Sequence, residues 1–514
     1  MVMDVAALTV GTIVSVLAGA SPSFSVASTI LAAVGITVVI GLPVFQLSGC
    51  HDRRMVFPHL SSLGRLAAAA AVTWILAAGV LWVLNLPAVP VQTVAALGPS
   101  IFTASILWRG GREGVAMMTP RAAAGGDVTA SPETPPRRHV VLEEDRLAVG
   151  ELICGESILI TGAGGSIGSE LCKQLLILRP RRLVLLEHSE FNLYQISNTL
   201  QAMIDASPAL SETEIHARLG DVRNRQHVLQ EIARHGVAVV FHAAAFKHVP
   251  IVEENEIDGV DNNVLGTWHA AEASARGGVK MFILVSTDKA DAPASVMGAG
   301  KRLAEQVVGA VQQRLIHQCP EGELPMAIKS VRFGNVVDSS GSVIPRFRSQ
   351  IDQGGPVTIT HPEARRFFMS VEEAVELILH AAVSGEPGSI SMLDMGPSIG
   401  IEDLARRMIH HAGFTVGDSH MAGSETEGTI EIVYTGLRPG ERLQERLPMT
   451  VAPTTDRLLH VPDSPPPWIE IETILTRLQQ AIDQRDADAV RSLLVEAVVE
   501  YPCVDAPAQY HFDS

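Results

Sequence analysis

The sequence predicts an α/β protein in which a four-helix membrane segment precedes a Rossmann-type, doubly wound parallel sheet. Three observations lead to this fold class. The first 109 residues contain four long apolar runs. A strand, a glycine-rich turn and a helix follow one another at 157–176, and further apolar strands alternate with helical stretches. Strands that alternate with helices are typical of parallel sheets covered on both faces.

Composition limits the functions that this chain can have. Its 514 residues suffice for two or three structural units, and its net charge is −17. Such an acidic chain is a poor partner for nucleic acid, so we expect no nucleic-acid binding. The five cysteines are scattered and form no C-x-x-C pair. This pattern suits a reducing compartment and indicates neither a disulfide framework nor a metal site.

The apolar runs occupy residues 5–20, 26–47, 66–84 and 89–108. A membrane-spanning helix needs about 20 mostly apolar residues, so the last three runs qualify and the first is borderline. The first run could instead be a cleaved signal peptide, because Ala-Gly-Ala at 18–20 resembles a cleavage site, although no basic residue precedes it. A buried soluble hairpin fits poorly, because the run at 66–84 has no polar face.

Arginines set the expected orientation of residues 1–109 in the membrane. The connectors at 21–25 and 85–88 carry no charge, whereas the stretches at 48–65 and 109–121 contain six arginines. Basic connectors stay in the cytoplasm. We therefore expect a multi-pass protein in contact with membrane lipid, with everything after residue 109 facing the cytoplasm. Residues 110–138 are rich in Gly, Ala, Pro and Thr, which predicts a flexible linker over 110–145.

The stretch SILITGAGGSIGSELCKQLL at 157–176 predicts a dinucleotide-binding turn. Gly162, Gly165 and Gly168 allow a tight turn and a close backbone approach to a pyrophosphate, and Ser166 and Ile167 begin the helix that would face this anion. Three glycines alone are a weak signal, but these stand between a strand and a helix, as the motif requires.

A second strand, RLVLLE, ends at Glu187, nineteen residues after Gly168. An acid in this place would bond the adenosine ribose and repel a 2′-phosphate, which favours NAD over NADP. His188 and the arginines at 181–182 weaken this preference, and Glu187 could also be a solvated strand end. Further strands are predicted at 238–242 and 281–285.

Polar residues with acid–base capacity follow the strand at 281–285. Thr287, Asp288 and Lys289 stand at the edge where such sheets bind substrates, and Lys301 lies twelve residues beyond on a helix. An exposed ion pair in a turn is the alternative interpretation of Asp288 and Lys289. Met297 occupies the place, four residues before the lysine, where enzymes of this class carry a tyrosine, and a thioether has no proton to exchange.

Ten ordered motifs show a family resemblance. They are TGAGGSIGSELCKQ (161–174), LLEHSEFNLY (185–194), GDVR (220–223), FHAAAFKHVPIVEEN (241–255), NNVLGT (262–267), STDKA (286–290), MGAGKR (297–302), VRFGNV (331–336), GSVIPRF (341–347) and TGLRPGERL (435–443). With the membrane segments, they make the chain resemble the membrane-bound, CapD-like UDP-N-acetylglucosamine 4,6-dehydratases of the extended short-chain dehydrogenase group. Members of this type resemble the chain in having Met at the tyrosine position, so Met297 does not indicate an inactive enzyme.

The resemblance implies a reaction for surface polysaccharide biosynthesis in the bacterial inner (cytoplasmic) membrane. NAD or NADP oxidises the UDP-sugar at C4, water is lost across C5–C6, and the hydride returns to C6. The substrate would be UDP-N-acetylglucosamine or a close relative. Asp288 would be the acid for the C6 hydroxyl, Lys289 the base near C5, and Lys301 the contact to the nicotinamide ribose. Thr287, Lys289 and a water remain open as acceptors of the C4 hydroxyl proton.

The resemblance also implies the remaining contacts and the division of the chain. Asp221 would contact adenine, and the cofactor pocket would further include Val222, Ala243, Ala244 and Lys247. The UDP group would be held by Asn335, Val343, Arg438 and Glu441. The expected parts are the membrane region 1–109, the linker, a Rossmann domain at 146–345, an interleaved nucleotide-sugar part at 346–465 and a helical tail at 466–514. We also expect a homo-oligomer.

Two other functions stay open at this point. One is an NAD(P)-dependent nucleotide-sugar epimerase, which the absence of a tyrosine at 297 disfavours. The other is a non-catalytic nucleotide-sugar-binding membrane scaffold, which would not need the acid–base groups Asp288, Lys289 and Lys301.

Overall fold

The computed structural model describes residues 143–320, 323–339, 341–393, 395–417, 428–445 and 458–501. The chain divides into two compact units, 1–127 and 128–514, and all described residues belong to the second. The predicted membrane segments therefore lie outside the described residues. Within the described ranges, no helix is both long and apolar enough to cross a membrane.

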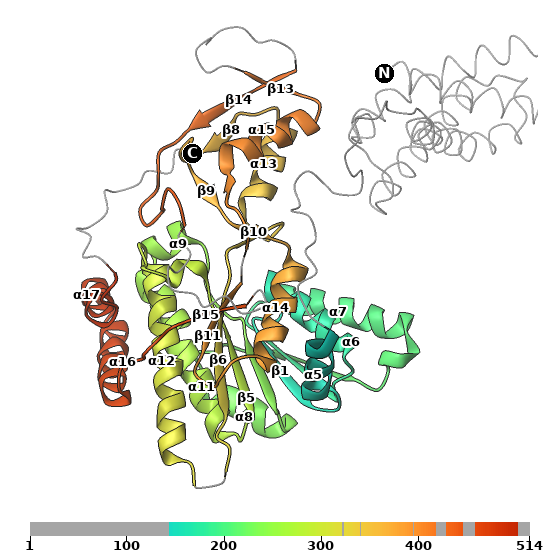
Figure 1. Ribbon diagram of the computed structural model, residues 1–514, viewed down its shortest axis with the longest axis vertical. Coiled ribbons are helices and arrows are strands. Elements are labelled where there is room, and N and C mark those ends of the chain that lie inside the picture. Colours follow the sequence, from blue (N-terminus) through green and yellow to red (C-terminus); the bar gives the residue numbers. More distant parts are fainter. Residues whose placement is uncertain are drawn as a thin grey trace, which may run out of the picture. The chain divides into compact units, whose positions relative to one another are not determined.

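The second unit is built on an eight-stranded sheet of order β3-β2-β1-β4-β5-β6-β11-β15 (Figure 1). All neighbouring strands are parallel except β15, which runs antiparallel to β11. The order 3-2-1-4-5-6 is that of a Rossmann sheet, so the predicted α/β parallel fold is confirmed. The strands are β1 (Ser157–Thr161), β2 (Arg182–Glu187), β3 (Glu214–Leu219), β4 (Val239–His242), β5 (Met281–Val285), β6 (Ala327–Arg332), β11 (Ile390–Leu393) and β15 (Leu458–Val461).

Helices cover both faces of this sheet, as Figure 1 shows. In β1, Ile158 and Ile160 contact one apolar cluster while Leu159 contacts the other, because successive side chains of a strand point to opposite faces. One cluster includes side chains of α5 (Glu143–Ile153), α6 (Ser166–Ile177), α7 (Glu190–Ala206) and α14 (Val371–Val383). The other includes side chains of α8 (Arg225–His235), α11 (Gly266–Arg276) and α12 (Val296–Gln318).

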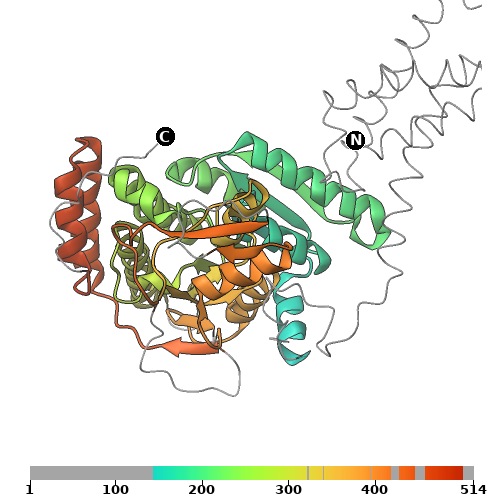
Figure 2. The same cartoon turned by 90° about the horizontal axis from the view of Figure 1, so that it is seen from above.

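A third layer lies on the outer side of α12. It consists of α9 (Val249–Glu254), α10 (Glu256–Val260), the π-helical turn η2 (Asp261–Leu265), α16 (Trp468–Asp483) and α17 (Ala487–Ala497). Their apolar side chains form one cluster with Met297 and Leu303 of α12. The red helices α16 and α17 are at the outer edge in both views (Figures 1 and 2).

A smaller part stands at the carboxyl edge of the main sheet. Its apolar cluster includes Ile344, Phe347, Ile401, Leu404 and Ile432. Its elements are β7 (Asn335–Val336), α13 (Val343–Asp352), β8 (Val357–Ile359), β9 (Arg365–Arg366), β10 (Phe368–Met369), β12 (Ile399–Gly400), α15 (Ile401–His411), β13 (Thr415–Gly417) and β14 (Thr429–Tyr434). Because α14 and β11 return to the main sheet between these elements, and β15 does so after them, the two parts share one interleaved chain.

Candidate active site

The carboxyl ends of the central strands bring most of the predicted site residues to one edge. Gly162, Glu187 and Ala243 stand at or just after the ends of β1, β2 and β4. The segment 286–289 follows β5, and Asn335 follows β6. Ligands of open α/β sheets bind outside this edge, so the position is suited to a nucleotide site.

The glycine turn has the close backbone packing that a dinucleotide-binding loop needs. Gly162 has a φ of +66°, and a Cβ placed on it would lie 2.8 Å from Cα of Ala244. A Cβ on Gly168 would clash with the carbonyl oxygen of Gly162. A side chain at Gly168 would separate α6 from the glycine turn, and one at Gly162 would push the turn away from the segment after β4. With Ser166 and Ile167 in its first turn, α6 presents an N-terminus that suits a pyrophosphate, so the residues present fit a dinucleotide.

Glu187 shapes this loop. Its carboxylate, 3% exposed, accepts the N–H of Gly164 at Oε2 and the N–H of Ser189 at Oε1, both at 3.0 Å. His188 Nδ1 lies 2.9 Å from the same Oε1. The carboxylate therefore ties the end of β2 to the glycine turn, in addition to the ribose contact predicted for it.

The remaining predicted cofactor residues lie around the same edge. Burial acts to raise the pKa of Asp221, but hydrogen bonds from Arg223 outweigh it and hold that pKa below its usual range. Val222 is buried in the sheet cluster that includes α8. Ala243 and Ala244 donate their N–H groups to Thr161, to its carbonyl at 3.1 Å and its hydroxyl at 3.4 Å.

The buried Asp288 and the partly exposed Lys289 form an ion pair directly after β5. The Asp288 side chain is 0% exposed, and its Oδ1 accepts Lys289 Nζ at 3.0 Å and the Thr287 hydroxyl at 2.9 Å. Its Oδ2 is buried and has no hydrogen-bond partner within the described part of the chain. A buried carboxylate oxygen without a partner is costly, so a hydroxyl or water that reached Oδ2 would gain a favourable hydrogen bond.

Lys289 also connects Asp288 to residues of the smaller part. Its Nζ also donates to Asn335 Oδ1 at 3.0 Å and lies 3.6 Å from Glu445 Oε1. Burial acts to lower the pKa of Lys289, but the charges of Asp288 and Glu445 raise it above its usual value. Lys289 is therefore an ammonium in the free site, and the predicted base role requires that it first pass a proton on.

Met297 and Lys301 lie in the first two turns of α12 but in different surroundings. Met297, 4% exposed, packs in the apolar cluster that includes Val252 and Val260. Lys301 is buried, and its Nζ donates to the carbonyl of Val285 at 2.7 Å. Burial lowers the pKa of Lys301 to about 8.

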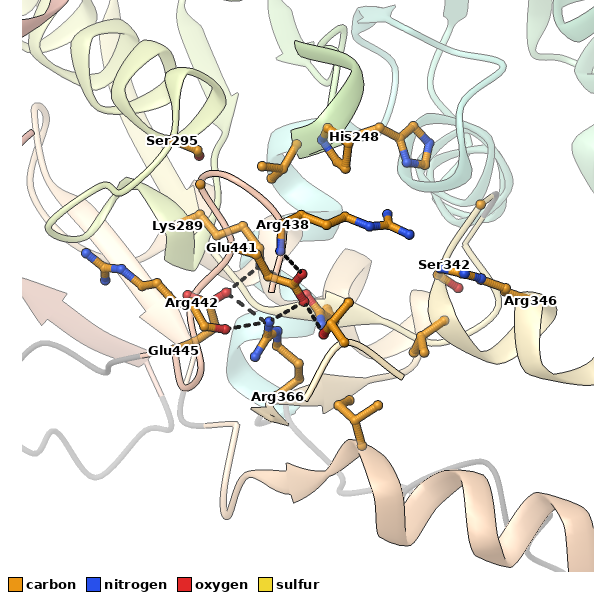
Figure 3. A pocket seen from close by; sticks show the side chains of 18 of the residues that line it. His248, Lys289, Ser295, Ser342, Arg346, Arg366, Arg438, Glu441, Arg442 and Glu445 are labelled. Atoms are coloured by element: carbon orange, nitrogen blue, oxygen red, sulfur yellow. Dashed lines mark hydrogen bonds and ion pairs between the residues drawn. The ribbon is translucent and has the colours of Figure 1, made fainter. Parts of the chain in front are cut away.

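A cavity of about 290 Å³ lies beside this pair and is lined by both parts of the unit (Figure 3). The lining includes six of the predicted site residues, Lys247, Lys289, Asn335, Val343, Arg438 and Glu441. It also includes residues that the sequence analysis missed, among them Arg346, Arg366, Arg442 and Glu445. Arg346 and Arg442 stand in motifs that already contained predicted residues, so the single arginine of GSVIPRF and the second arginine of GLRPGER were the available signal.

Cations outnumber carboxylates in this lining. Arg366 pairs with Glu441 at 3.1 Å and lies 3.7 Å from Glu445. Figure 3 shows the Arg438 side chain extending away from these three residues. Arg346 donates to Thr358 Oγ1 at 2.6 Å, and its pKa is lowered by burial and then by the charge of Arg438. Two guanidinium groups that repel each other suit a bound diphosphate.

A buried ion network supports the loop that carries Asp288. Glu305 of α12 accepts the Ser286 hydroxyl at 2.6 Å and the Arg332 guanidinium at 2.6 and 2.8 Å. Arg332 NH1 also lies 3.4 Å from Asp291 Oδ1. The network joins β5, β6 and α12 behind the Asp288–Lys289 pair and limits the movement of that loop.

Comparison with known proteins agrees with this architecture. Residues 158–457 match the family described as "Polysaccharide biosynthesis protein". The chain is 39% identical over 306 residues to the capsular polysaccharide biosynthesis protein CapD of Staphylococcus aureus, covering 60% of this chain and 47% of CapD, so it spans about half of that relative. It is 33% identical over 292 residues to the UDP-glucose 4-epimerase of Rickettsia akari, covering 57% of this chain and 77% of the epimerase.

A solved structure shares the fold as well. The structure of Pen from Bacillus thuringiensis has a TM-score of 0.52 and 28% sequence identity, covering 60% of this chain and 88% of Pen. The family match extends from β1 to the segment before β15 and includes the glycine turn, the Asp288–Lys289 pair and the cationic cavity. The chain therefore belongs to the polysaccharide biosynthesis protein family.

Proposed function

We propose that this chain is a nucleotide-sugar 4,6-dehydratase that acts on UDP-N-acetylglucosamine or a close relative, for surface polysaccharide biosynthesis. One observation carries the proposal. Lys289 lines the cavity rich in arginine and is paired with the buried Asp288, whose second carboxylate oxygen has no hydrogen-bond partner among the described residues. A scaffold that only binds a nucleotide sugar has no need of such a pair, whereas an elimination needs an acid and a base within reach of each other.

The glycine turn and the start of α6 would hold a nicotinamide dinucleotide, with Lys301 near its nicotinamide ribose. When bound, this cofactor supplies a hydride acceptor that later becomes the hydride donor. The Glu187 carboxylate at the end of β2 favours NAD over NADP, because a 2′-phosphate would bring a second negative charge to it.

The cavity would hold the UDP group. Arg346 and Arg438 suit the diphosphate, because a guanidinium can form two parallel hydrogen bonds to phosphate oxygens. Asn335, Val343 and Glu441 would complete the contacts, as the family resemblance implies. Lys289 bonds Asn335, so the acid–base pair and the predicted UDP contacts are held together.

The pair can supply the acid and the base of the elimination from a single shared proton. In the free site the proton rests on Lys289. Its transfer to Asp288 Oδ1, across the 3.0 Å hydrogen bond, gives a neutral amine and a carboxylic acid together. The amine can then remove the C5 proton while the acid protonates the departing C6 hydroxyl, which restores the ion pair and releases water.

The acceptor of the C4 hydroxyl proton stays open among Thr287, Lys289 and a water. Thr287 has one geometric advantage, because its hydroxyl already donates to Asp288 Oδ1.

The decisive experiment follows deuterium from C4 of UDP-N-acetylglucosamine in the presence of NAD⁺. A dehydratase gives a product lighter by one water, with the label at C6. Asp288→Asn should lower kcat by about 10²–10⁴-fold, because it removes a general acid. Label that washes into solvent, or an Asp288→Asn enzyme as fast as the parent, contradicts the proposal.

An epimerase is the second candidate, and the likeness to the Rickettsia UDP-glucose 4-epimerase favours it. The same incubation separates the two reactions. An epimerase gives a sugar isomer of unchanged mass and keeps the deuterium on C4.

We also propose that residues 1–109 anchor the enzyme in the bacterial inner membrane, with the catalytic unit in the cytoplasm. The four apolar runs and the position of the arginines in their connectors support this topology.

A further inference from the structure

The helices α16 and α17 lie beyond the residues of the family match, 158–457, yet they pack on the helix that begins beside the cavity. We propose that this helical pair positions the start of α12 for catalysis, with Arg491 as the positioning residue and Glu253 as its partner. The effect on turnover rests on the proposed dehydratase function, whereas the effect on α12 itself does not.

Glu253 holds the first turn of α12. Its Oε1 accepts the N–H of Val296 at 2.6 Å, and Val296 is the first residue of α12. The first N–H groups of a helix have no partner within the helix, and a negative charge at this end is favourable. Glu253 therefore satisfies a donor that the helix cannot satisfy itself and fixes where the helix begins.

The same point adjoins the wall of the cavity. Ser295, the N-cap of α12, and Gly440 both line the cavity. A Cβ placed on Gly440 would lie 2.6 Å from Cβ of Ser295 and 3.1 Å from Glu253 Oε1. Glu253 itself belongs to α9, which directly follows the lining residues Lys247 and His248. A shift of Glu253 would therefore reach three segments of the wall.

Arg491 of α17 provides the positive charge behind this carboxylate. Its guanidinium lies 3.9 Å from Glu253 Oε2 and forms an ion pair with Glu256. The Glu253 side chain is 9% exposed, and burial raises its pKa, while Arg491 acts in the opposite direction. Without Arg491, the carboxylates of Glu253 and Glu256 would repel each other, and Glu253 would be a weaker acceptor for Val296.

Two further contacts hold α12 to the C-terminal segment along its length. Arg302 of α12 pairs with Asp463 at 2.6 Å, and the Arg314 guanidinium lies 4.1 Å from the centre of the Trp468 ring. The first contact ties α12 to the segment that precedes α16, and the second ties it to the first residue of α16. The Lys301 bond to the Val285 carbonyl depends on the same placement, because Lys301 lies only five residues after Val296.

The test compares Arg491→Gln and Arg491→Lys with a matched control, Arg477→Gln. Arg477 pairs with Glu496 at 2.5 Å, and this exposed pair joins α16 only to α17. Arg491→Gln should lower kcat about ten- to a hundredfold, the range that a small misplacement of reacting groups costs. It should also speed hydrogen exchange at the Val296 amide. Arg491→Lys should restore most of both properties, and Arg477→Gln should leave both unchanged.

The opposite results overturn the inference. In the first, the Arg491→Gln enzyme keeps the parental kcat and the parental rate of hydrogen exchange at the Val296 amide. In the second, Arg477→Gln lowers kcat as much as Arg491→Gln does. If Arg491→Gln does not fold, Glu253→Gln takes its place with the same expectations, because it keeps an acceptor for Val296 and removes the charge. A parent without dehydratase activity contradicts the proposed function, while exchange at Val296 still decides the positioning role.

Discussion

Met297 and Lys301 are one helical turn apart on α12, and both are buried, but only one has a titratable group. The thioether of Met297 packs among aliphatic side chains, whereas the ammonium of Lys301 bonds a single backbone carbonyl. Of these two side chains only Lys301 is able to exchange a proton, as Asp288 and Lys289 are across the site.

We predict that Met297→Ala lowers stability but not turnover. Removing a buried Met side chain costs about 2–5 kcal/mol, because the packing around it collapses only in part. Met297→Leu nearly conserves the volume and should cost less than about 1.5 kcal/mol. Urea unfolding measures the first effect, and kcat well below the unfolding temperature measures the second. A large loss of kcat in Met297→Leu would indicate a chemical role for the sulfur.

We predict that kcat/KM falls as the pH rises through about 8. Burial lowers the pKa of Lys301 to about 8, so the ammonium is present below that pH and is lost above it. The charged form is the one that would polarise the nicotinamide ribose, and kcat/KM reports ionisations of the free enzyme. Burial also lowers the pKa of Lys247. A pH profile of Lys247→Gln that keeps the alkaline fall assigns it to Lys301, and a profile without the fall assigns it to Lys247.

At the scale of the element, the glycine turn makes a sharp prediction. Gly168→Ala places a methyl group against the carbonyl oxygen of Gly162, so α6 must move away from the turn. We expect NAD⁺ binding, measured by calorimetry, to fall at least tenfold, because the pyrophosphate contacts come from this helix end. Gly150→Ala on α5 meets nothing within 4 Å and is the matched control. If both variants bound NAD⁺ with equal affinity, the proposal that the cofactor binds at this turn would be wrong.

The sequence predicted the strands that are buried on both faces, because such strands are continuous apolar runs between turns. RLVLLE became β2, and the strands predicted at 238–242 and 281–285 became β4 and β5. The wall of the cavity was less predictable. Arg366 and Glu441 are 75 residues apart along the chain and come into contact because β9 lies beside the loop after β14. A local sequence pattern cannot predict a contact over this separation.

The loop contacts of Glu187 were missed for a related reason. Its place after the second strand predicted a ribose contact, and that role stays a prediction. The hydrogen bonds to Gly164 and Ser189 come from two turns whose relative position the sequence does not state. Spacing along the chain predicts which residue stands at the carboxyl edge of the sheet. The hydrogen bonds of that residue depend on the conformation of the neighbouring loops, which spacing does not give.

At the scale of the whole molecule, the chain passes several times between the main sheet and the smaller part of the second unit. β11 and β15 belong to the main sheet although the elements before and after β11 build the smaller part. The smaller part is therefore joined to the main sheet by several chain segments rather than by one linker. Several connections limit how far the two walls of the cavity can move apart.

The last prediction concerns the boundary between this unit and the proposed membrane anchor. The helix α5 packs on the sheet and α14, and its Ile153 is 0% exposed. A fragment of residues 128–514 should therefore fold, bind NAD⁺ and stay in the supernatant, while the full chain sediments with membranes. A fragment that begins at Glu156 lacks α5 and should lose roughly 1.5–3 kcal/mol of stability for each large apolar side chain removed from the core.

Ultracentrifugation of lysed cells and urea unfolding of the two fragments check this prediction. The full chain in the supernatant would contradict the anchor, since residues 1–109 would then lack the membrane contact that their four apolar runs predict. Equal stability of the two fragments would show instead that α5 belongs to the linker rather than to the catalytic core. The two measurements are independent, because the first reports on residues 1–109 and the second on the packing of Val149 and Ile153.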